Sequence, residues 1–330
     1  MTDAPQSSPE AETTFQDDHR LAEQIVAQLR RVVLGQDAVI DEVMTALLAG
    51  GHVLLEGAPG LGKTLLVKAL ARTFGGRFSR IQFTPDLMPS DVTGHALYNM
   101  NERRFEIRRG PVFTHLLLAD EINRAPAKTQ AALLEVMQEH QVTIEGKSLQ
   151  VGQPFMVLAT QNPIEQEGTY PLPEAELDRF MLKVFIDYPQ EQDEIALVQA
   201  VASTPSEMDY MQNVTVCAGP EQVLGLQARA RAVTLDPAVL SYAVALSRAT
   251  REHRGLLRGA GPRGAINLVM AARAKAFLAG RDFVIPDDVK TIAKPVLRHR
   301  LQLSADMEIE GVQADQVLDQ LLDSVAAPRQ

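Results

Sequence analysis

The strongest constraint on this chain is a glycine-rich loop of eight residues. The loop comprises Gly57, Ala58, Pro59, Gly60, Leu61, Gly62, Lys63 and Thr64. The apolar run His52–Leu55 precedes the loop, and a helical apolar pattern begins at Leu65. The loop therefore connects a predicted strand to the start of a predicted helix.

A glycine-rich loop in this position is suited to binding phosphate. Its glycines let successive backbone N–H groups turn towards phosphate oxygens, and the N-terminus of the helix adds positive potential. Lys63 can reach the outer phosphates, and Thr64 can reach a bound Mg²⁺. Because the spacing and the strand-loop-helix context both hold, residues 57–65 indicate a nucleotide site rather than a turn with a surface lysine.

Composition limits the class of protein. The 330 residues suggest about two domains, and a hydrophobic content of 45% is enough for a sizeable core. The net charge of −10 argues against a surface built as a whole for nucleic acid or an anionic membrane. The single cysteine, Cys217, excludes an intrachain disulfide and a cysteine-based zinc cluster. Without a signal segment or a long apolar stretch, we expect a cytoplasmic protein without membrane insertion.

The segment before the loop is predicted to contain a leader and two helices. Residues 1–16 are rich in Ser, Pro, Thr and Glu and offer little apolar surface to bury, which predicts a disordered leader. Apolar residues at helical spacing then predict one helix from Asp17 and a second from Ala38. The turn between them contains Gly35, which is predicted as the C-cap of the first helix.

A second apolar strand, His115–Ala119, ends in two carboxylates, Asp120 and Glu121. The C-terminal ends of parallel strands face the crevice where ligands bind in open α/β sheets. One carboxylate there can hold hydrated Mg²⁺, and the next can activate water for attack on the γ-phosphate. Such a pair is usually structural when it stands alone, but with the glycine-rich loop upstream it indicates ATP hydrolysis.

Two further strand ends carry candidate site residues with open alternatives. The strand Phe155–Ala159 leads to Asn162, which either hydrogen-bonds the attacking water or forms a turn before a proline. Arg179 precedes a fourth apolar run. It either pairs with a nearby carboxylate, Asp178 or Glu176, or reaches the nucleotide of another subunit.

The order of the elements predicts two domains. From residue 17 to about 190, strands alternate with helices, which predicts an α/β domain with a parallel sheet and helices on both faces. Hairpins are predicted near 85–110 and 141–153. Residues 191–330 show helical patterns only. They end in an acidic amphipathic helix that either packs on this domain or docks a partner.

Two groups of basic residues have open interpretations. Arg103, Arg104, Arg108 and Arg109 cluster in the first predicted hairpin, as a solvated edge or as a partner surface. Residues 221–300 contain 14 Lys and Arg against 6 Asp and Glu, as solvated helix faces or as a lid over a triphosphate. Arg263 stands at a predicted helix start, where the helix dipole favours an acidic residue, so its position suggests an anion partner.

From about residue 21 to 303, the chain resembles the AAA+ ATPases and, among them, the MoxR family. The segments are GAPGLGKT (57–64), similar to Walker A; LLLADEINRAPAKTQAALLEVMQE (116–139), similar to Walker B; ATQNP (159–163), similar to sensor 1; LDRF (177–180), similar to the arginine-finger segment; and GPRG (261–264), similar to sensor 2. GRDFVIPDDV (280–289) and VLRHRL (296–301) are similar to the lid signature of the family. The family usually has GASPRA where this chain has GAGPRG, which keeps the arginine and makes its loop more flexible.

The resemblance implies a P-loop AAA+ core followed by a smaller all-helical lid. It also implies a homo-oligomeric ring, typically a hexamer, with ATP and Mg²⁺ between subunits. In such a site Lys63 binds the β- and γ-phosphates, and Thr64 and Asp120 hold Mg²⁺. Glu121 activates the attacking water and Asn162 positions it.

The resemblance further implies that Arg179 acts in trans on a neighbouring subunit and that Arg263 acts in cis. The residues expected to line the adenine pocket are Val33, Gly35 and Gln36. The two hairpins are expected to face the pore or partners. MoxR proteins commonly act with von Willebrand factor A domain proteins in metal insertion or maturation of enzyme complexes, which implies such a partner and a client here.

Two other functions stay open on the sequence. A DNA-translocating motor is disfavoured by the acidic net charge and the lack of tryptophan, although the arginines of the first hairpin suit phosphates. A nucleotide-gated scaffold with negligible hydrolysis is disfavoured by the pair Asp120 and Glu121. We therefore expect an ATPase with chaperone-like action on a client protein.

Overall fold

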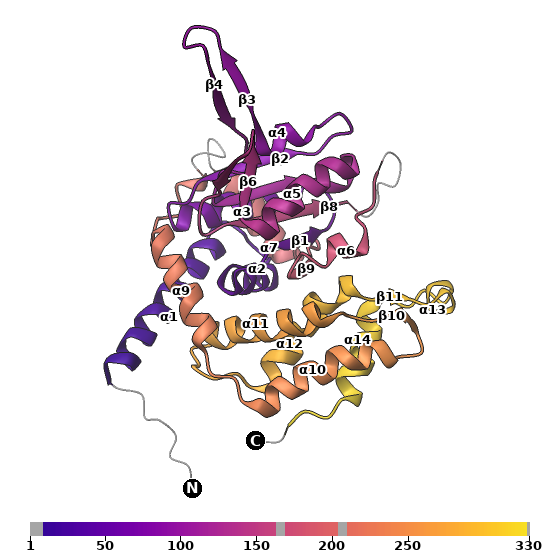
Figure 1. Ribbon diagram of the computed structural model, residues 1–330. Helices are drawn as coiled ribbons and strands as arrows, with labels where there is room; N and C mark the ends of the chain where they lie inside the picture. The colour runs from indigo at the N-terminus through magenta and orange to yellow at the C-terminus, as the bar shows by residue number, and fades with distance from the viewer. Residues whose placement is uncertain (1–8, 163–168, 204–209, 329–330) are drawn as a thin grey trace.

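The computed structural model describes residues 9–162, 169–203 and 210–328. It consists of an α/β part and a helical part, the latter drawn in orange and yellow in the lower half of Figure 1. This division agrees with the predicted α/β core and helical lid. Within the described ranges, no helix has both the length and the apolar character needed to span a membrane.

The α/β part is built on a five-stranded parallel sheet with the strand order β2-β5-β8-β1-β9. The strands are β1 (Val53–Glu56), β2 (Phe78–Gln82), β5 (Leu116–Asp120), β8 (Met156–Gln161) and β9 (Leu182–Phe185). The three central strands are apolar and almost wholly buried because both faces of the sheet are covered. All five strands run in one direction, so their C-terminal ends meet at one edge.

Hydrophobic clusters on the two faces of the sheet define the layers. Alternate strand residues enter different clusters: Val53 and Leu55 join one, and Leu54 joins the other. The first cluster includes α1 (Pro9–Arg30), α2 (Asp37–Ala49) and α3 (Lys63–Thr73), and the second includes α5 (Ala127–Glu139). The short elements are α4 (Pro89–Thr93), η1 (Ile122–Arg124) and α6 (Glu174–Leu177).

Two antiparallel hairpins extend from this part, as predicted. β3 (Gly94–Asn99) pairs with β4 (Arg104–Arg109), and β6 (Gln141–Ile144) pairs with β7 (Lys147–Gln150). The first hairpin projects from the top of the molecule in Figure 1. Its Arg104 pairs with Glu102 and Glu106. Arg109 lies over the Phe113 ring, 5.2 Å from the centroid, so part of the arginine cluster is engaged within the chain.

Two expectations for the N-terminal segment are wrong. The structure begins α1 at Pro9, so residues 9–16 are helical and do not belong to a disordered leader. Phe15 gives this stretch a surface to bury, because its ring meets that of Phe277 edge-on with 5.5 Å between centroids. Gly35 is not the C-cap of α1, which ends before it. It lies in the turn that precedes α2, with φ of +71°.

After the sheet the chain forms α7 (Glu191–Ala202), which Figure 1 labels beside the strands of the sheet. The helical part then contains α9 (Pro220–Ala232), α10 (Pro237–Glu252), α11 (Pro262–Leu278), α12 (Pro286–Leu297), α13 (Ala305–Ile309) and α14 (Ala314–Ser324). It also contains η2 (Arg298–Arg300) and a strand pair, β10 (Leu256–Arg258) and β11 (Gln302–Leu303). The acidic helix α14 buries Val317, Leu318 and Leu321. Its Asp319 pairs with Lys294 of α12 at 2.6 Å, so this helix packs on the helical part.

Glu42 lies on α2, where the α/β part meets the helical part. Burial raises the pKa of its carboxyl to about 7. The charges of Arg298 and Lys275 oppose this rise, whereas those of Asp315 and Asp41 add to it. Because folding raises this pKa from its ordinary value of 4.5, the folded state loses stability as the pH rises from 4.5 to about 7.

Glu42→Gln removes the ionisable group and keeps the size of the side chain. We expect the free energy of unfolding of the variant to exceed that of the parent by about 1–3 kcal/mol at pH 8, and by less at pH 5. Chemical denaturation at both pH values measures the difference. Glu135→Gln, at an exposed position of α5, serves as the control. An equal effect of Glu42→Gln at both pH values would contradict the raised pKa of Glu42.

Candidate functional site

The glycine-rich loop connects β1 to α3 at the C-terminal edge of the sheet, as predicted. Gly57 is required by a close approach, because a Cβ there would lie 2.3 Å from the carbonyl oxygen of Ile186. Gly60 and Gly62 have φ of +85° and +78°, values that other L residues rarely adopt. A Cβ on either glycine would meet nothing within 4 Å. The backbone of the loop is therefore accessible to a ligand at these two positions.

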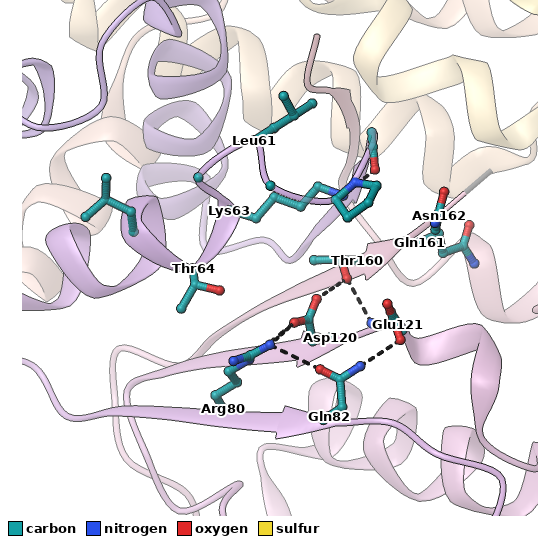
Figure 2. A pocket seen from close by; sticks show the side chains of 15 residues that line it. Leu61, Lys63, Thr64, Arg80, Gln82, Asp120, Glu121, Thr160, Gln161 and Asn162 are labelled. Atoms are coloured by element: carbon teal, nitrogen blue, oxygen red, sulfur yellow. Dashed lines mark hydrogen bonds and ion pairs between the residues drawn. The ribbon is translucent and has the colours of Figure 1, made fainter. Parts of the chain in front are cut away.

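A cleft of about 390 Å³ lies between this loop and the ends of β2, β5 and β8 (Figure 2). Its lining consists of Gly57, Pro59, Gly60, Leu61, Gly62, Lys63, Thr64, Leu65, Arg80, Gln82, Asp120, Glu121, Thr160, Gln161 and Asn162. Except for Ala58, every residue predicted to bind phosphate lines the cleft. The predicted metal ligand Asp120 and the predicted water-binding residues Glu121 and Asn162 line it too. Residues that are far apart in the sequence thus meet as the strand ends predict.

Lys63 begins α3 and belongs to the wall of this cleft. Its Nζ donates a hydrogen bond of 2.5 Å to the carbonyl oxygen of Gly57. Burial lowers the pKa of the ammonium, and the charges of Asp120, Glu121 and Glu56 oppose this effect. These carboxylates therefore favour the protonated form, which is the form that binds phosphate.

Thr160, at the end of β8, holds the two carboxylates at the end of β5. Its hydroxyl donates to Asp120 Oδ1 at 2.6 Å and accepts from the backbone N–H of Glu121 at 2.8 Å. Thr160 is 1% exposed, so these contacts are shielded from water. Glu121 has a left-handed backbone with φ of +56°, a conformation that is unusual for a non-glycine residue and clusters at functional sites.

Four residues of the cleft lining are not predicted as site residues from the sequence: Thr160 and Gln161 of β8, and Arg80 and Gln82 of β2. Arg80 Nη2 lies 2.6 Å from Asp120 Oδ2, and Gln82 Nε2 donates to Glu121 Oε2 at 2.7 Å (Figure 2). Arg80 Nη2 also donates to Gln82 Oε1 at 3.1 Å, which links the two contacts. Polar residues at alternate positions of a strand are a visible signal. The residues that these side chains contact depend on the pairing of β2 with β5, which the sequence does not specify.

The donor set of the cleft fits a hydrated Mg²⁺. The Thr64 hydroxyl and the Asp120 carboxylate supply oxygen ligands, which Mg²⁺ prefers, and both residues line the cleft. The side chains of β2 that contact the two carboxylates, Arg80 and Gln82, are hydrogen-bond donors and do not add negative charge that would compete for the cation. Arg80 shares Asp120, so a cation at this carboxylate competes with a guanidinium for the same negative charge.

The residues predicted to contact adenine lie beside the loop but do not line the cleft. Gln36 Nε2 donates to the carbonyl oxygen of Asp187 at 2.7 Å. Gly35 approaches Pro189 so closely that a Cβ would lie 2.8 Å from the proline Cβ. Val33 is buried. The segment therefore packs against the chain that follows β9, and its contact with adenine stays a prediction.

Arg179 and Arg263 lie away from the cleft of their own chain. They line a cavity of about 170 Å³ together with Gly51 and His52, which precede β1. The glycine-rich loop follows β1, so the strand, roughly 13 Å long, separates the loop from this cavity. The expectation that Arg263 faces the phosphates bound by its own chain is therefore wrong for this structure. Arg263 instead lies near Arg179, at the edge of the sheet where the parallel strands begin.

Asp178 pairs with the helical part rather than with Arg179. Its Oδ1 accepts from Arg300 Nε at 2.8 Å, and its Oδ2 lies 3.7 Å from Arg263 Nη1. Burial raises the pKa of Glu176, and the charge of Arg179 opposes the rise. In the part of the chain that the structure describes, however, no carboxylate forms an ion pair within 4.0 Å of the Arg179 guanidinium. Direct pairing with Asp178 or Glu176 is therefore not the arrangement found.

The cleft brings together the groups that phosphoanhydride hydrolysis requires. Backbone N–H groups and Lys63 offer positive potential to phosphate oxygens. Thr64 and Asp120 offer oxygen ligands to a cation, and Glu121 offers a fixed carboxylate to a water molecule. The arrangement is thus suited to bind a magnesium-nucleotide complex and to direct water at its terminal phosphate.

Known proteins share this organisation. The ATPase family associated with various cellular activities (AAA) matches residues 52–182, and the AAA lid domain matches residues 248–321. The chain is 44% identical to the uncharacterized protein YeaC of Bacillus subtilis, over 96% of this chain and 98% of that protein. It is 42% identical to the chaperone MoxR1 of Mycobacterium tuberculosis, over 93% of this chain and 82% of that protein. The crystal structure of a presumed ATPase from Cytophaga hutchinsonii matches with a TM-score of 0.90 and 41% identity, over 97% of this chain and 98% of that one.

Proposed function

Because this chain belongs to the MoxR family of AAA+ ATPases, we propose that it hydrolyses ATP in a ring of its own copies and thereby remodels partner proteins. The observation that supports hydrolysis most directly is the meeting of Lys63 with Asp120 and Glu121 in one cleft. A protein that only binds nucleotide needs no carboxylate fixed for water activation. Here Glu121 is held by its neighbours on β2 and β8.

In the proposed mechanism each cleft residue has one role. Lys63 and the N–H groups of the loop hold the β- and γ-phosphates. Thr64 and Asp120 hold Mg²⁺, which neutralises charge on the phosphate oxygens when bound. Glu121 accepts a proton from the attacking water, and Asn162 hydrogen-bonds that water. Catalysis in this scheme comes from position and charge rather than from a covalent intermediate.

The placement of Arg179 and Arg263 supports a ring. Both arginines line one cavity at the N-terminal edge of the sheet, whereas the glycine-rich loop lies at the C-terminal edge, so neither arginine is near the phosphate-binding loop of its own chain. A head-to-tail interface brings the N-terminal edge of one subunit to the loop of the next, and a closed set of such interfaces forms a ring. We therefore propose that Arg179 and Arg263 act together in trans, in a homo-oligomer that is typically a hexamer for this family.

Phosphate release from the purified protein tests the proposed activity. We expect release that depends on both ATP and Mg²⁺, and a particle in the presence of ATP that is several times the chain mass of 36.1 kDa. Release assays and light scattering measure the two properties. ATP binding without phosphate release would favour the nucleotide-gated scaffold instead.

DNA translocation receives little support from the first hairpin. Arg104 is paired with glutamates, and Arg109 is stacked on a phenylalanine ring. The net charge of −10 also opposes binding to a polyanion. We expect duplex DNA to leave the rate of phosphate release unchanged. Salt-dependent binding of DNA together with faster release would reverse this assignment.

The partners of the ring are proposed from the family. We propose a von Willebrand factor A domain protein as the adaptor and an enzyme complex as the client, with metal insertion as one form of maturation. A variant that binds ATP without hydrolysing it should hold such a complex longest. Capture with immobilised Glu121→Gln protein in MgATP, compared with the same protein in ADP, tests for the partner.

A further inference from the structure

Among the side chains of the helical part that contact the segment carrying Arg179, Arg300 makes the most hydrogen bonds. We define the finger segment as residues 178–181. Arg300 Nε donates to Asp178 Oδ1 at 2.8 Å, and Arg300 Nη2 donates to the carbonyl oxygen of Phe180 at 2.6 Å. The same guanidinium donates to the carbonyl oxygens of Asp178 at 3.2 Å and Met181 at 3.3 Å. These contacts lie on both sides of Arg179.

The anchor is buried and charged. The Arg300 side chain is 2% exposed. Burial lowers its pKa to about 10, and the charge of Asp178 opposes that effect, so the guanidinium stays protonated at neutral pH. The neighbouring His299 places its Nε2 3.0 Å from the carbonyl oxygen of Phe180. Such a guanidinium with a planar set of donors restricts the backbone that it contacts.

The α/β part holds the finger segment at other points. Phe180 is fully buried in the second hydrophobic cluster, and the backbone N–H of Met181 donates to the carbonyl oxygen of His52 at 2.8 Å. Arg179 itself is half-buried and lies next to these fixed residues in the chain. The direction of its guanidinium therefore depends on a backbone that both parts of the chain hold. Arg263 of α11 shares this anchor, because it lies 3.7 Å from Asp178.

We propose that Arg300 is a positioning residue for Arg179, through which the helical part of one subunit sets the arginine that serves the nucleotide site of the next. This inference rests on the proposed function, in which Arg179 acts in trans. A movement of the helical part relative to the sheet therefore changes the finger segment through Arg300. The state of one subunit is thereby transmitted to its neighbour without a contact between the two nucleotides.

A matched pair of variants separates positioning from stability. Arg300→Lys keeps the charge but cannot make all the contacts of the guanidinium fork. The control is Arg281→Lys. Arg281 forms an ion pair with Asp288 through two hydrogen bonds of 2.6 Å and 2.8 Å and donates to the carbonyl oxygen of Phe283 at 3.1 Å, all within the helical part. Both variants are assayed at a temperature at which circular dichroism shows them folded.

Arg300→Lys is expected to lower kcat by about 10- to 100-fold while the affinity for ATP stays unchanged, because the cleft of its own chain is intact. Arg281→Lys is expected to retain kcat within about two-fold. An equal loss in both variants would show a general effect on the helical part and overturn the proposal. A change in ATP affinity that accounts for the whole loss in Arg300→Lys would overturn it as well.

Turnover of mixed rings distinguishes a loss of positioning from a folding defect. Subunits with Arg300→Lys have an intact Glu121, and subunits with Glu121→Gln have an intact finger segment. Mixing the two impaired proteins should therefore raise turnover above that of either protein alone, at interfaces that combine the intact halves. Restoration with Arg179→Ala but not with Arg300→Lys would overturn the positioning role and leave the proposed function standing. A parent protein without turnover would overturn both.

Asp178→Asn tests the same contact from the finger segment when Arg300→Lys does not fold. Asp178 has 32% of its side chain exposed, so its substitution disturbs the interior less than a change at Arg300. The amide still accepts the hydrogen bond from Arg300 Nε but removes the charge. We expect a fall in kcat that mixing with Glu121→Gln subunits restores. An unchanged kcat, or a loss that mixing does not restore, would overturn the proposal.

Discussion

Glu121→Gln should bind MgATP like the parent and lose about 10²- to 10⁴-fold in turnover. The amide keeps the size of the side chain and remains within reach of Gln82 and Arg124, which lie 2.7 Å and 3.1 Å from Glu121 Oε2. It cannot accept a proton from water, so the chemical step is lost while binding is kept. Phosphate release at saturating MgATP measures turnover, and a fluorescent ATP analogue measures affinity.

Two companion variants make this result specific. Asp120→Asn should weaken binding that depends on Mg²⁺ as well as turnover, because Asp120 is the proposed metal ligand. Glu135→Gln, on the exposed face of α5, should leave both unchanged. Parental turnover by Glu121→Gln would remove Glu121 from the mechanism. An equal loss of ATP affinity in Glu121→Gln and Asp120→Asn would instead make Glu121 a binding residue.

Most of the cleft could be predicted because its residues sit where local patterns are strongest. The glycine-rich loop has a spacing that few other functions require, and Asp120 ends an apolar strand that reads clearly as buried. Parallel strands place their C-terminal ends at one edge whatever their order. The meeting of Asp120 with Lys63 and Asn162 therefore follows from the strand directions alone.

The remaining parts depend on which elements become neighbours. Arg80 enters the cleft only because β2 pairs with β5, and strand order is not a local property. Arg263 stands at a helix start as expected, yet its position relative to the sheet is set by the packing of α11 on α2. Phe15, a residue of the predicted leader, likewise packs on a residue far away in the sequence, Phe277. Local patterns identify such residues but do not place them.

Arg179→Ala is expected to lower turnover by about 10³- to 10⁵-fold, the range found for arginines that stabilise the charge of a transferring phosphoryl group. ATP binding to the cleft should persist, because the cavity of Arg179 lies at the other edge of the sheet. Arg258→Ala is the control, since it removes a guanidinium that pairs with Glu174 at 2.6 Å but is 69% exposed. This exposed pair should contribute little, and its loss should change turnover by less than about two-fold.

Mixed rings of Arg179→Ala and Glu121→Gln subunits decide whether the arginine crosses an interface. Each homogeneous ring lacks one group at every site. In an equal mixture about a quarter of head-to-tail interfaces join an intact Glu121 to an intact Arg179, so activity should return to that fraction when sites act independently. An arginine that acted within its own chain could not be supplied by a neighbour, because the Glu121→Gln subunit that keeps Arg179 lacks the base. Absence of restoration in rings shown to contain both subunits would therefore assign Arg179 to the structure of its own subunit.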